Sequence, residues 1–379
     1  MEIIRVLHVA SFTGNIGDNA NHTGFRNKLA KCFGESTHIK YDEFEIRKVF
    51  WGQECFGKNF VRLANSYDLV VIGGGNYFEL WVEDSPTGTS ISISLDDLKK
   101  IKTPIAFNAL GVDPAQGVSE AALIKFRAFL DYTISNPKIL LSCRNDGSMK
   151  ALRTLVGVKY AESFFHVPDA GFFTEVVHNY HPEINGNSKN ILIQLAGDMI
   201  DVRFTKNSNN SISYKEFLNE MSSYIQEIAK KSNANFILVP HIFRDLDVIH
   251  SLIDLLPDDI RRSRLSVAPY LTGQGGQDYI FDLYRKVDLV LGMRFHANIC
   301  AIGQKINCIG LVNYRQIDEL YSELALDDLK VRVNEPFSTK LEGLTMRFLN
   351  DELKIDFVIL KEWEIKLSIF HNEIKKLLL

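Results

Sequence analysis

The chain has 379 residues, which is too long for one ordinary hydrophobic core and therefore predicts two domains. Its hydrophobic fraction of 46% and charged fraction of 24% are typical of a globular protein, and a formal net charge of −4 argues against general nucleic-acid binding. Five scattered cysteines without a CxxC spacing favour reduced thiols over disulfides or a zinc site. The N-terminus shows no secretory pattern, and no apolar run approaches the length of a membrane span, so we expect a cytoplasmic protein.

Short apolar runs alternate with longer amphipathic ones along the whole chain, which is typical of parallel α/β architecture. In the first half, strands are predicted at residues 3–10, 69–72, 105–109, 139–142 and 164–167, and helices at 19–33, 118–132 and 146–156. In the second half, strands are predicted at 191–196, 236–240, 265–268, 289–291 and 306–311, and helices at 214–231, 246–256, 279–286 and 297–302. The two halves predict two Rossmann-like domains that face each other across a cleft.

The predicted domains are 1–180, 181–345 and a C-terminal helical segment, 346–379. A linker is expected near residues 177–189, which contain Pro182 and Gly186, and a mobile polar loop is expected at 206–213. Residues 355–379 carry apolar side chains at helical spacing with lysines between them. Such a helix fits a membrane surface, but we expect it to pack back on the domains, with peripheral membrane contact at most.

Arg294 and His296 lie where the apolar run 287–292 passes into a helix that ends at Gly303. In an open α/β sheet, ligands bind at the carboxyl ends of the strands, and the N-terminus of the following helix attracts anions. A guanidinium and an imidazole placed there suit an anion with two acidic groups. An incidental helix turn is the alternative, but an arginine at the positive end of a helix dipole is unfavourable unless an anion compensates it.

Glycines follow two other predicted strands. Gly17 and Asp18 belong to a turn at 14–19 that opens a helix, where Asp18 is placed either to act as a base or to cap the helix. This turn is not the GxGxxG dinucleotide fingerprint. Residues 73–75 are three consecutive glycines, which favour close approach of a ligand or of another domain over a merely flexible loop.

Three more strand ends carry polar side chains. Arg144 is expected to point toward the same carboxyl-end face, with a surface salt bridge as the alternative. Asp169 is interpreted as a turn residue. His241 is a candidate for the lining of the cleft, although a lone histidine is more often structural.

Taken together, these segments resemble the polysaccharide pyruvyl transferase family. The matching pieces, in the family's order, are GNIGD at 14–18, VIGGGN at 71–76, CRNDGS at 143–148, PDAGF at 168–172, PH…D at 240–245 and DLVLGMRFHANICAIG at 288–303. The resemblance implies a GT-B-like fold and the transfer of a pyruvyl group from phosphoenolpyruvate to a sugar as a cyclic ketal. It places Arg294 and His296 in the phosphoenolpyruvate site and makes Arg144 a further candidate donor ligand.

The predicted catalytic residues are therefore Arg294, His296 and Asp18. The predicted acceptor or cleft residues are Asn15, Gly17, Asp18, Gly74, Gly75, Asn76 and His241. Neither a metal nor a cofactor is expected besides the donor substrate. The acceptor is expected to be a sugar of an exopolysaccharide or capsule precursor, free or lipid-linked at the inner face of the plasma membrane.

Two positions depart from the family pattern. Lys305 stands about where the family has proline, and Tyr314 is followed by Arg315 where the family has a closely following lysine. Two other functions stay open: a GT-B glycosyltransferase that uses a nucleotide sugar, and a non-catalytic module that binds glycans or anions. A nicotinamide-dependent dehydrogenase is disfavoured because the dinucleotide fingerprint is absent from the sequence.

Overall fold

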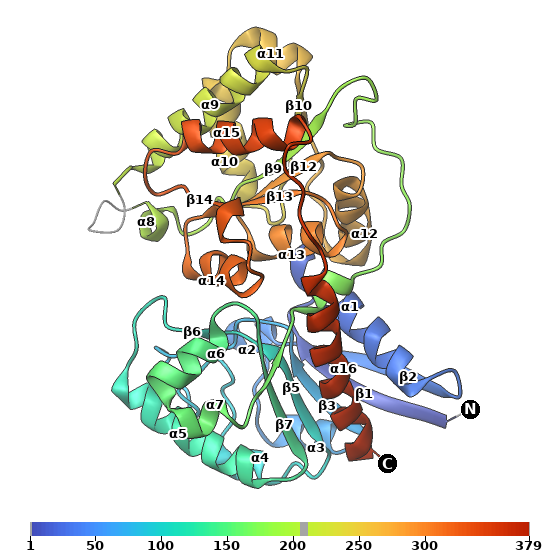
Figure 1. The fold of residues 1–379 in the computed structure, drawn as a ribbon. Helices are drawn as coiled ribbons and strands as arrows, with labels where there is room; N and C mark the ends of the chain where they lie inside the picture. Colours follow the sequence, from blue (N-terminus) through green and yellow to red (C-terminus); the bar gives the residue numbers. More distant parts are fainter. Residues whose placement is uncertain (1, 205–210, 379) are drawn as a thin grey trace. The chain divides into compact units, whose positions relative to one another are not determined.

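The chain folds into two units, each built on a six-stranded parallel sheet (Figure 1). The computed structural model describes residues 2–204 and 211–378. Unit 1 comprises Met1–Phe12, Asn21–Ala170 and Leu360–Leu379, and unit 2 comprises Thr13–Ala20 and Gly171–Ile359. These bounds differ from the predicted 1–180, 181–345 and 346–379, because the segment 13–20 clusters with unit 2 and the C-terminal helix with unit 1.

The sheet of unit 1 has the strand order β2-β1-β3-β5-β7-β8. Its strands are β1 (Glu2–Ala10), β2 (Thr37–Glu45), β3 (Leu69–Gly73), β5 (Ile105–Leu110), β7 (Ile139–Arg144) and β8 (Phe165–Val167). All were predicted except β2, an edge strand whose residues are exposed or only partly buried and so form no apolar run. Two short strands, β4 (Phe78–Glu79) and β6 (Val112–Asp113), pair with each other.

Helices cover this first sheet, and the fully buried strands β3 and β5 lie in its middle. The helical elements are α1 (Ile16–Phe33), α2 (Arg47–Phe50), α3 (Lys58–Ala64), α4 (Leu95–Leu98), α5 (Glu120–Ser135), α6 (Ser148–Ala151), η1 (Leu152–Val156), α7 (Val158–Ala161) and η2 (Ala170–Phe173). Ser119 caps α5 by accepting a hydrogen bond from the amide of Ala122.

The C-terminal helix α16 (Ile359–Leu378) packs back onto unit 1, as predicted (Figure 1). Trp363 meets His166 edge-on at 5.0 Å between ring centroids, and Phe370 contacts Phe165, a residue of β8, at 5.4 Å. Glu364 forms an ion pair with Lys28 of α1. Within the described residues, no helix is both long and apolar enough to cross a lipid bilayer.

The sheet of unit 2 has the strand order β11-β10-β9-β12-β13-β14. Its strands are β9 (Asn190–Gln194), β10 (Asn235–Leu238), β11 (Leu265–Val267), β12 (Leu289–Gly292), β13 (Cys308–Val312) and β14 (Lys330–Arg332). Its helical elements are α8 (Ile200–Arg203), α9 (Tyr214–Lys231), α10 (Asp245–Leu255), α11 (Asp258–Ser263), α12 (Gly273–Tyr284), α13 (Phe295–Gly303), α14 (Arg315–Glu323), η3 (Asp327–Leu329) and α15 (Ser338–Leu349).

The order of the strands in unit 2 reverses between β9 and β12. From β9 the chain builds outward through β10 to β11, and from β12 it builds in the opposite direction through β13 to β14. Such a switch point leaves a crevice beyond the carboxyl ends of the two central strands, where open α/β sheets bind ligands. The loops after β9 and β12 therefore border the position where a sheet of this topology binds its ligand.

The segment predicted as a linker, 177–189, is held by unit 2. The backbone amide of Asn179 donates to Asp282 of α12 at 2.8 Å, and the His181 imidazole hydrogen-bonds the same carboxylate at 2.9 Å. The division between the units comes earlier, at Ala170 and Gly171. Of the loop expected at 206–213, residues 206–210 lie outside the described residues.

Candidate functional site

Arg294 lies between the end of β12 and the start of α13, and two carboxylates hold its guanidinium. Its Nε donates to Asp245 Oδ2 at 2.9 Å, and its Nη2 lies 2.5 Å from Asp245 Oδ1 and 2.6 Å from Asp198 Oδ1. The side chain is 12% exposed. An external anion was expected to compensate this arginine, but two of the chain's own carboxylates do so.

Asp245 begins α10 and is fully buried. Besides Arg294, its oxygens accept hydrogen bonds from the backbone amides of Gly197, His241 and Ile242 at 2.9 to 3.1 Å. Burial alone would raise the pKa of this carboxyl, but the Arg294 charge and these hydrogen bonds outweigh it and leave the pKa below its usual value. Asp245 is thus an ionised anchor that fixes the direction of the Arg294 fork.

Arg203 and Tyr314 complete the surroundings of Asp198. The Arg203 Nη2 lies 3.4 Å from Asp198 Oδ2, so each oxygen of this carboxylate faces one guanidinium. The Arg203 guanidinium also stacks on the Tyr314 ring at 4.9 Å, and the Tyr314 hydroxyl accepts a hydrogen bond from the amide of Phe295 at 2.7 Å. Two arginines therefore converge on one anion position.

Four neighbouring strands supply these groups. Asp245 follows β10, Asp198 follows β9, Arg294 follows β12 and Tyr314 follows β13, and these four strands are consecutive in the sheet. Because the strands are parallel, their carboxyl ends meet at one edge. Asp198 and Arg203 were not predicted from the sequence, because they belong to none of the motifs. Asp245 is the last residue of the PH…D match, but no role was predicted for it.

His296 lies in the first turn of α13 against the turn at 15–18, which belongs to the same unit. Its Nδ1 is 3.8 Å from Asp18 Oδ1, and the Asn15 amide donates to the same oxygen at 3.3 Å. A Cβ added at Gly17 would lie 2.4 Å from the His296 Cβ, so only glycine fits there. The structure thus brings together four of the predicted site residues: Asn15, Gly17, Asp18 and His296.

Arg144 belongs to unit 1, at the carboxyl end of β7. It is almost fully buried, its Nε donates to Asp146 at 2.6 Å, and its Nη1 lies 3.8 Å from Asp169. The alternative of a surface salt bridge is therefore wrong. Asp169 is fully buried and contributes to the charge around Arg144, so it is more than the turn residue that was expected.

The three glycines at 73–75 fit tightly against their own unit. Gly74 has φ +71°, and a Cβ there would lie 2.3 Å from the side-chain oxygen of Asn21. A Cβ at Gly75 would lie 2.4 Å from the ring of Tyr77. Packing within unit 1 thus requires these glycines, which were expected because of a ligand or a second domain. The neighbouring Asn76 amide donates to Asp113 Oδ2 at 2.7 Å.

His241 does not line an open surface as predicted. It has no exposed surface, and its Nε2 lies 2.9 Å from the hydroxyl of Tyr284. Burial, together with the nearby charge of Arg294, lowers its pKa to about 3, although Asp245 acts in the opposite direction. The imidazole is therefore neutral, and His241 contributes its backbone amide to Asp245 rather than its ring to a ligand.

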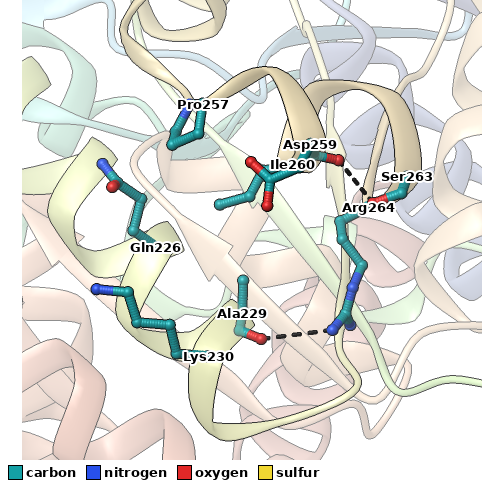
Figure 2. A pocket seen from close by; sticks show the side chains of 8 residues that line it. All are labelled: Gln226, Ala229, Lys230, Pro257, Asp259, Ile260, Ser263 and Arg264. Atoms are coloured by element: carbon teal, nitrogen blue, oxygen red, sulfur yellow. Dashed lines mark hydrogen bonds between the residues drawn. The ribbon is translucent and has the colours of Figure 1, made fainter.

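The cavity in Figure 2 lies elsewhere in unit 2, between α9 and α11. Arg264 points across it and donates to the Ala229 carbonyl at 3.4 Å, while the Ser263 hydroxyl donates to the Asp259 carbonyl at 2.6 Å (Figure 2). Arg264 immediately precedes β11, so this cavity is at the amino-end edge of the sheet. The cluster around Arg294 lies at the opposite edge of the sheet. The Arg264 guanidinium and the Ser263 hydroxyl of this cavity donate hydrogen bonds to backbone carbonyls.

The chain matches one family and several solved structures. A family model described as polysaccharide pyruvyl transferase matches residues 15–314. No curated protein is significantly similar in sequence. Similar structures include S. aureus MnaA with UDP, the UDP-GlcNAc 2-epimerase of Neisseria meningitidis bound to UDP-GlcNAc, and a glycosyltransferase of Rickettsia africae.

The likeness to these structures extends over nearly the whole chain. For MnaA, identity is 11%, coverage is 96% of this chain and 91% of that chain, and the TM-score is 0.54. The Neisseria epimerase is 12% identical, with coverage of 96% of this chain and 94% of that chain and a TM-score of 0.52. The Rickettsia glycosyltransferase is also 12% identical, with coverage of 99% of this chain and 94% of that chain and a TM-score of 0.52. At such identities the likeness shows the fold alone, which is the GT-B type with two Rossmann-like units.

Proposed function

Because the chain belongs to the polysaccharide pyruvyl transferase family, we propose that it moves the pyruvyl group of phosphoenolpyruvate onto a sugar of a polysaccharide precursor. The product is a cyclic ketal, and phosphate is released. One observation carries the donor assignment: Arg203 and Arg294 converge on a single anion position at the carboxyl ends of the strands, and His296 begins the adjacent helix. Phosphoenolpyruvate carries a carboxylate and a phosphate, which suit this arrangement.

The reaction requires one proton to be delivered and two to be removed. Protonation of the methylene carbon makes the central carbon electrophilic, and a sugar hydroxyl attacks it and loses its proton. A second hydroxyl of the sugar then displaces phosphate from the same carbon and loses its proton as well. The protein must neutralise the anionic donor and stabilise the cationic character of the central carbon.

Three residues of unit 2 are proposed for the main roles. Arg294, oriented by Asp245, is assigned to bind the anionic donor. His296 is the proposed acid, toward either the methylene carbon or the departing phosphate. Asp18, which accepts a hydrogen bond from Asn15 and lies 3.8 Å from His296, is the proposed base for the attacking hydroxyl.

Other predicted residues keep narrower proposed roles. Arg144 of unit 1 is proposed as a further donor ligand, because its buried guanidinium is held in place by Asp146. Gly17 and Asn76 are still proposed to contact the sugar acceptor. Arginines would carry the charge of the donor, so no metal or cofactor is part of the proposed reaction. Its proposed location is the cytoplasm, and its proposed acceptor is free or lipid-linked.

The test is to incubate the purified protein with phosphoenolpyruvate and hexosides that carry a free pair of hydroxyls. We expect phosphate release matched by an acceptor that gains the mass of phosphoenolpyruvate less phosphoric acid. His296→Ala should abolish ketal formation and keep the native melting temperature, whereas His250→Ala, at a side chain that is 79% exposed, should leave the rate unchanged. Consumption of a UDP-sugar instead would establish a glycosyltransferase, and tight binding without phosphate release a binding module.

A further inference from the structure

Asp198 occupies the position at which two arginines converge. Its Oδ1 lies 2.6 Å from Arg294 Nη2, and its Oδ2 lies 3.4 Å from Arg203 Nη2. A ligand carboxylate or phosphate that bound both guanidiniums at this position could not do so beside Asp198 without bringing two anions into contact.

The two carboxylates on Arg294 differ in how firmly they are held. Asp245 is fully buried and accepts three backbone hydrogen bonds in addition to those from Arg294. Asp198 is 25% exposed, and within the described residues its only partners are the side chains of Arg203 and Arg294. Removing Asp245 would leave buried amides without acceptors, whereas Asp198 can move into solvent if another anion replaces it.

The backbone beside Asp198 adopts an unfavourable conformation. Met199 has φ +54°, a left-handed conformation that is unfavourable for a non-glycine residue. Met199 connects Asp198 to α8, which carries Arg203, and its side chain is exposed. The residue that joins the two charged side chains is therefore in a conformation that non-glycine residues rarely adopt.

We propose that Asp198 is an internal occupant of the anion subsite formed by Arg203 and Arg294, and that an anionic group of the donor displaces it on binding. This inference rests on the proposed function for the identity of the donor. Arg203 and Arg294 face the two carboxylates of Asp198 and Asp245. Exchange of Asp198 for an anionic group of the donor keeps both guanidiniums compensated. Asp198 thus lowers the affinity for small anions and disfavours those that cannot engage both arginines.

The test measures binding of inorganic phosphate and, separately, of pyruvate by titration calorimetry. In Asp198→Asn and Asp198→Ala, the competing anion is gone, so we expect the Kd of at least one probe to fall about tenfold or more. The probe that gains identifies the donor group, phosphate or carboxylate, that takes the subsite. Asp201→Asn is the matched control, because it removes the same charge from an exposed position on α8.

Unchanged or weaker binding of both probes in the Asp198 variants would overturn the inference. So would failure of both variants to fold, because Asp198 would then be a structural residue like Asp245. The proposed function is tested separately by ketal formation in the unaltered protein. Ketal formation without a gain in anion affinity contradicts the inference alone, and a gain in affinity without ketal formation contradicts the proposed function alone.

Discussion

Asp245 binds the guanidinium of Arg294 through both of its oxygens, to Nε at 2.9 Å and to Nη2 at 2.5 Å. Three backbone amides donate to the same carboxylate. The arginine is therefore oriented before any ligand arrives, and the remaining Nη1 makes no hydrogen bond with the described residues. A group fixed in this way loses little conformational entropy when it binds an anion.

Replacing Arg294 with lysine should lower kcat/KM for phosphoenolpyruvate by about 100-fold. A lysine ammonium is a point charge and cannot bind Asp245 through two parallel hydrogen bonds while it also reaches a ligand, and one charge-assisted bond is worth about 1.5–3 kcal/mol. Steady-state kinetics measures the loss. Arg244→Lys, at an exposed position nearby, should have a normal rate, and a normal rate in Arg294→Lys would exclude that residue from the donor site.

Replacing Asp245 with alanine should destabilise unit 2 by about 3–5 kcal/mol, because it leaves the buried Arg294 charge and three amides without their acceptor. Urea unfolding monitored by circular dichroism gives the free energy. Asp247→Ala, at an exposed position on the same helix, should cost far less. If both variants lose the same stability, Asp245 does not anchor the cluster.

Replacing Gly17 with alanine should lower the rate of ketal formation at least tenfold, since the new Cβ would lie 2.4 Å from the Cβ of His296 and must push the imidazole aside. The matched control is Gly275→Ala in α12, where a Cβ meets nothing within 4 Å. That variant should keep the full rate. Equal rates for the two variants would show that the position of His296 does not matter to the reaction.

Acid should destabilise unit 2 through His241. Burial lowers its pKa to about 3 in the folded state, so between about pH 6.5 and pH 3 the unfolded chain binds a proton that the folded chain does not. The free energy of unfolding should therefore fall as the pH falls through this range. Urea unfolding at about pH 7 and pH 5 should show a smaller difference for His241→Gln than for the unaltered protein or for His250→Gln, at an exposed site.

Strands and helices with a clear hydrophobic pattern could be predicted from the sequence. Buried strands such as β3 and β12 and the amphipathic helix α9 lie within one or two residues of the predicted positions. The edge strands β2 and β14 escaped prediction because they bury little and pair along one side only. The prediction of a linker at 177–189 was wrong because two of its polar residues, Asn179 and His181, form hydrogen bonds with Asp282.

Some residues of the candidate site could likewise be predicted from the sequence, and others could not. The position of Arg294 and His296 between a strand and a helix could be predicted because the apolar run and the helical stretch follow one another directly, whereas their role in binding stays a prediction. Asp198 and Arg203 could not, because their importance depends on Arg294, from which Asp198 is 96 positions distant. His241 misled because sequence does not distinguish a histidine that faces a ligand from one buried against Tyr284.

The cluster of Asp198, Asp245, Arg294 and Tyr314 has a consequence for how the protein refolds. The cluster is incomplete in any fragment of unit 2 that lacks one of β9, β10, β12 or β13, because each of these strands is followed by one of its four groups. Parallel strands pair only after long stretches of chain have been brought together, which is slow. Helix content should thus recover early during refolding, and phosphate binding should appear late, as a reporter that the central strands have assembled in their native order.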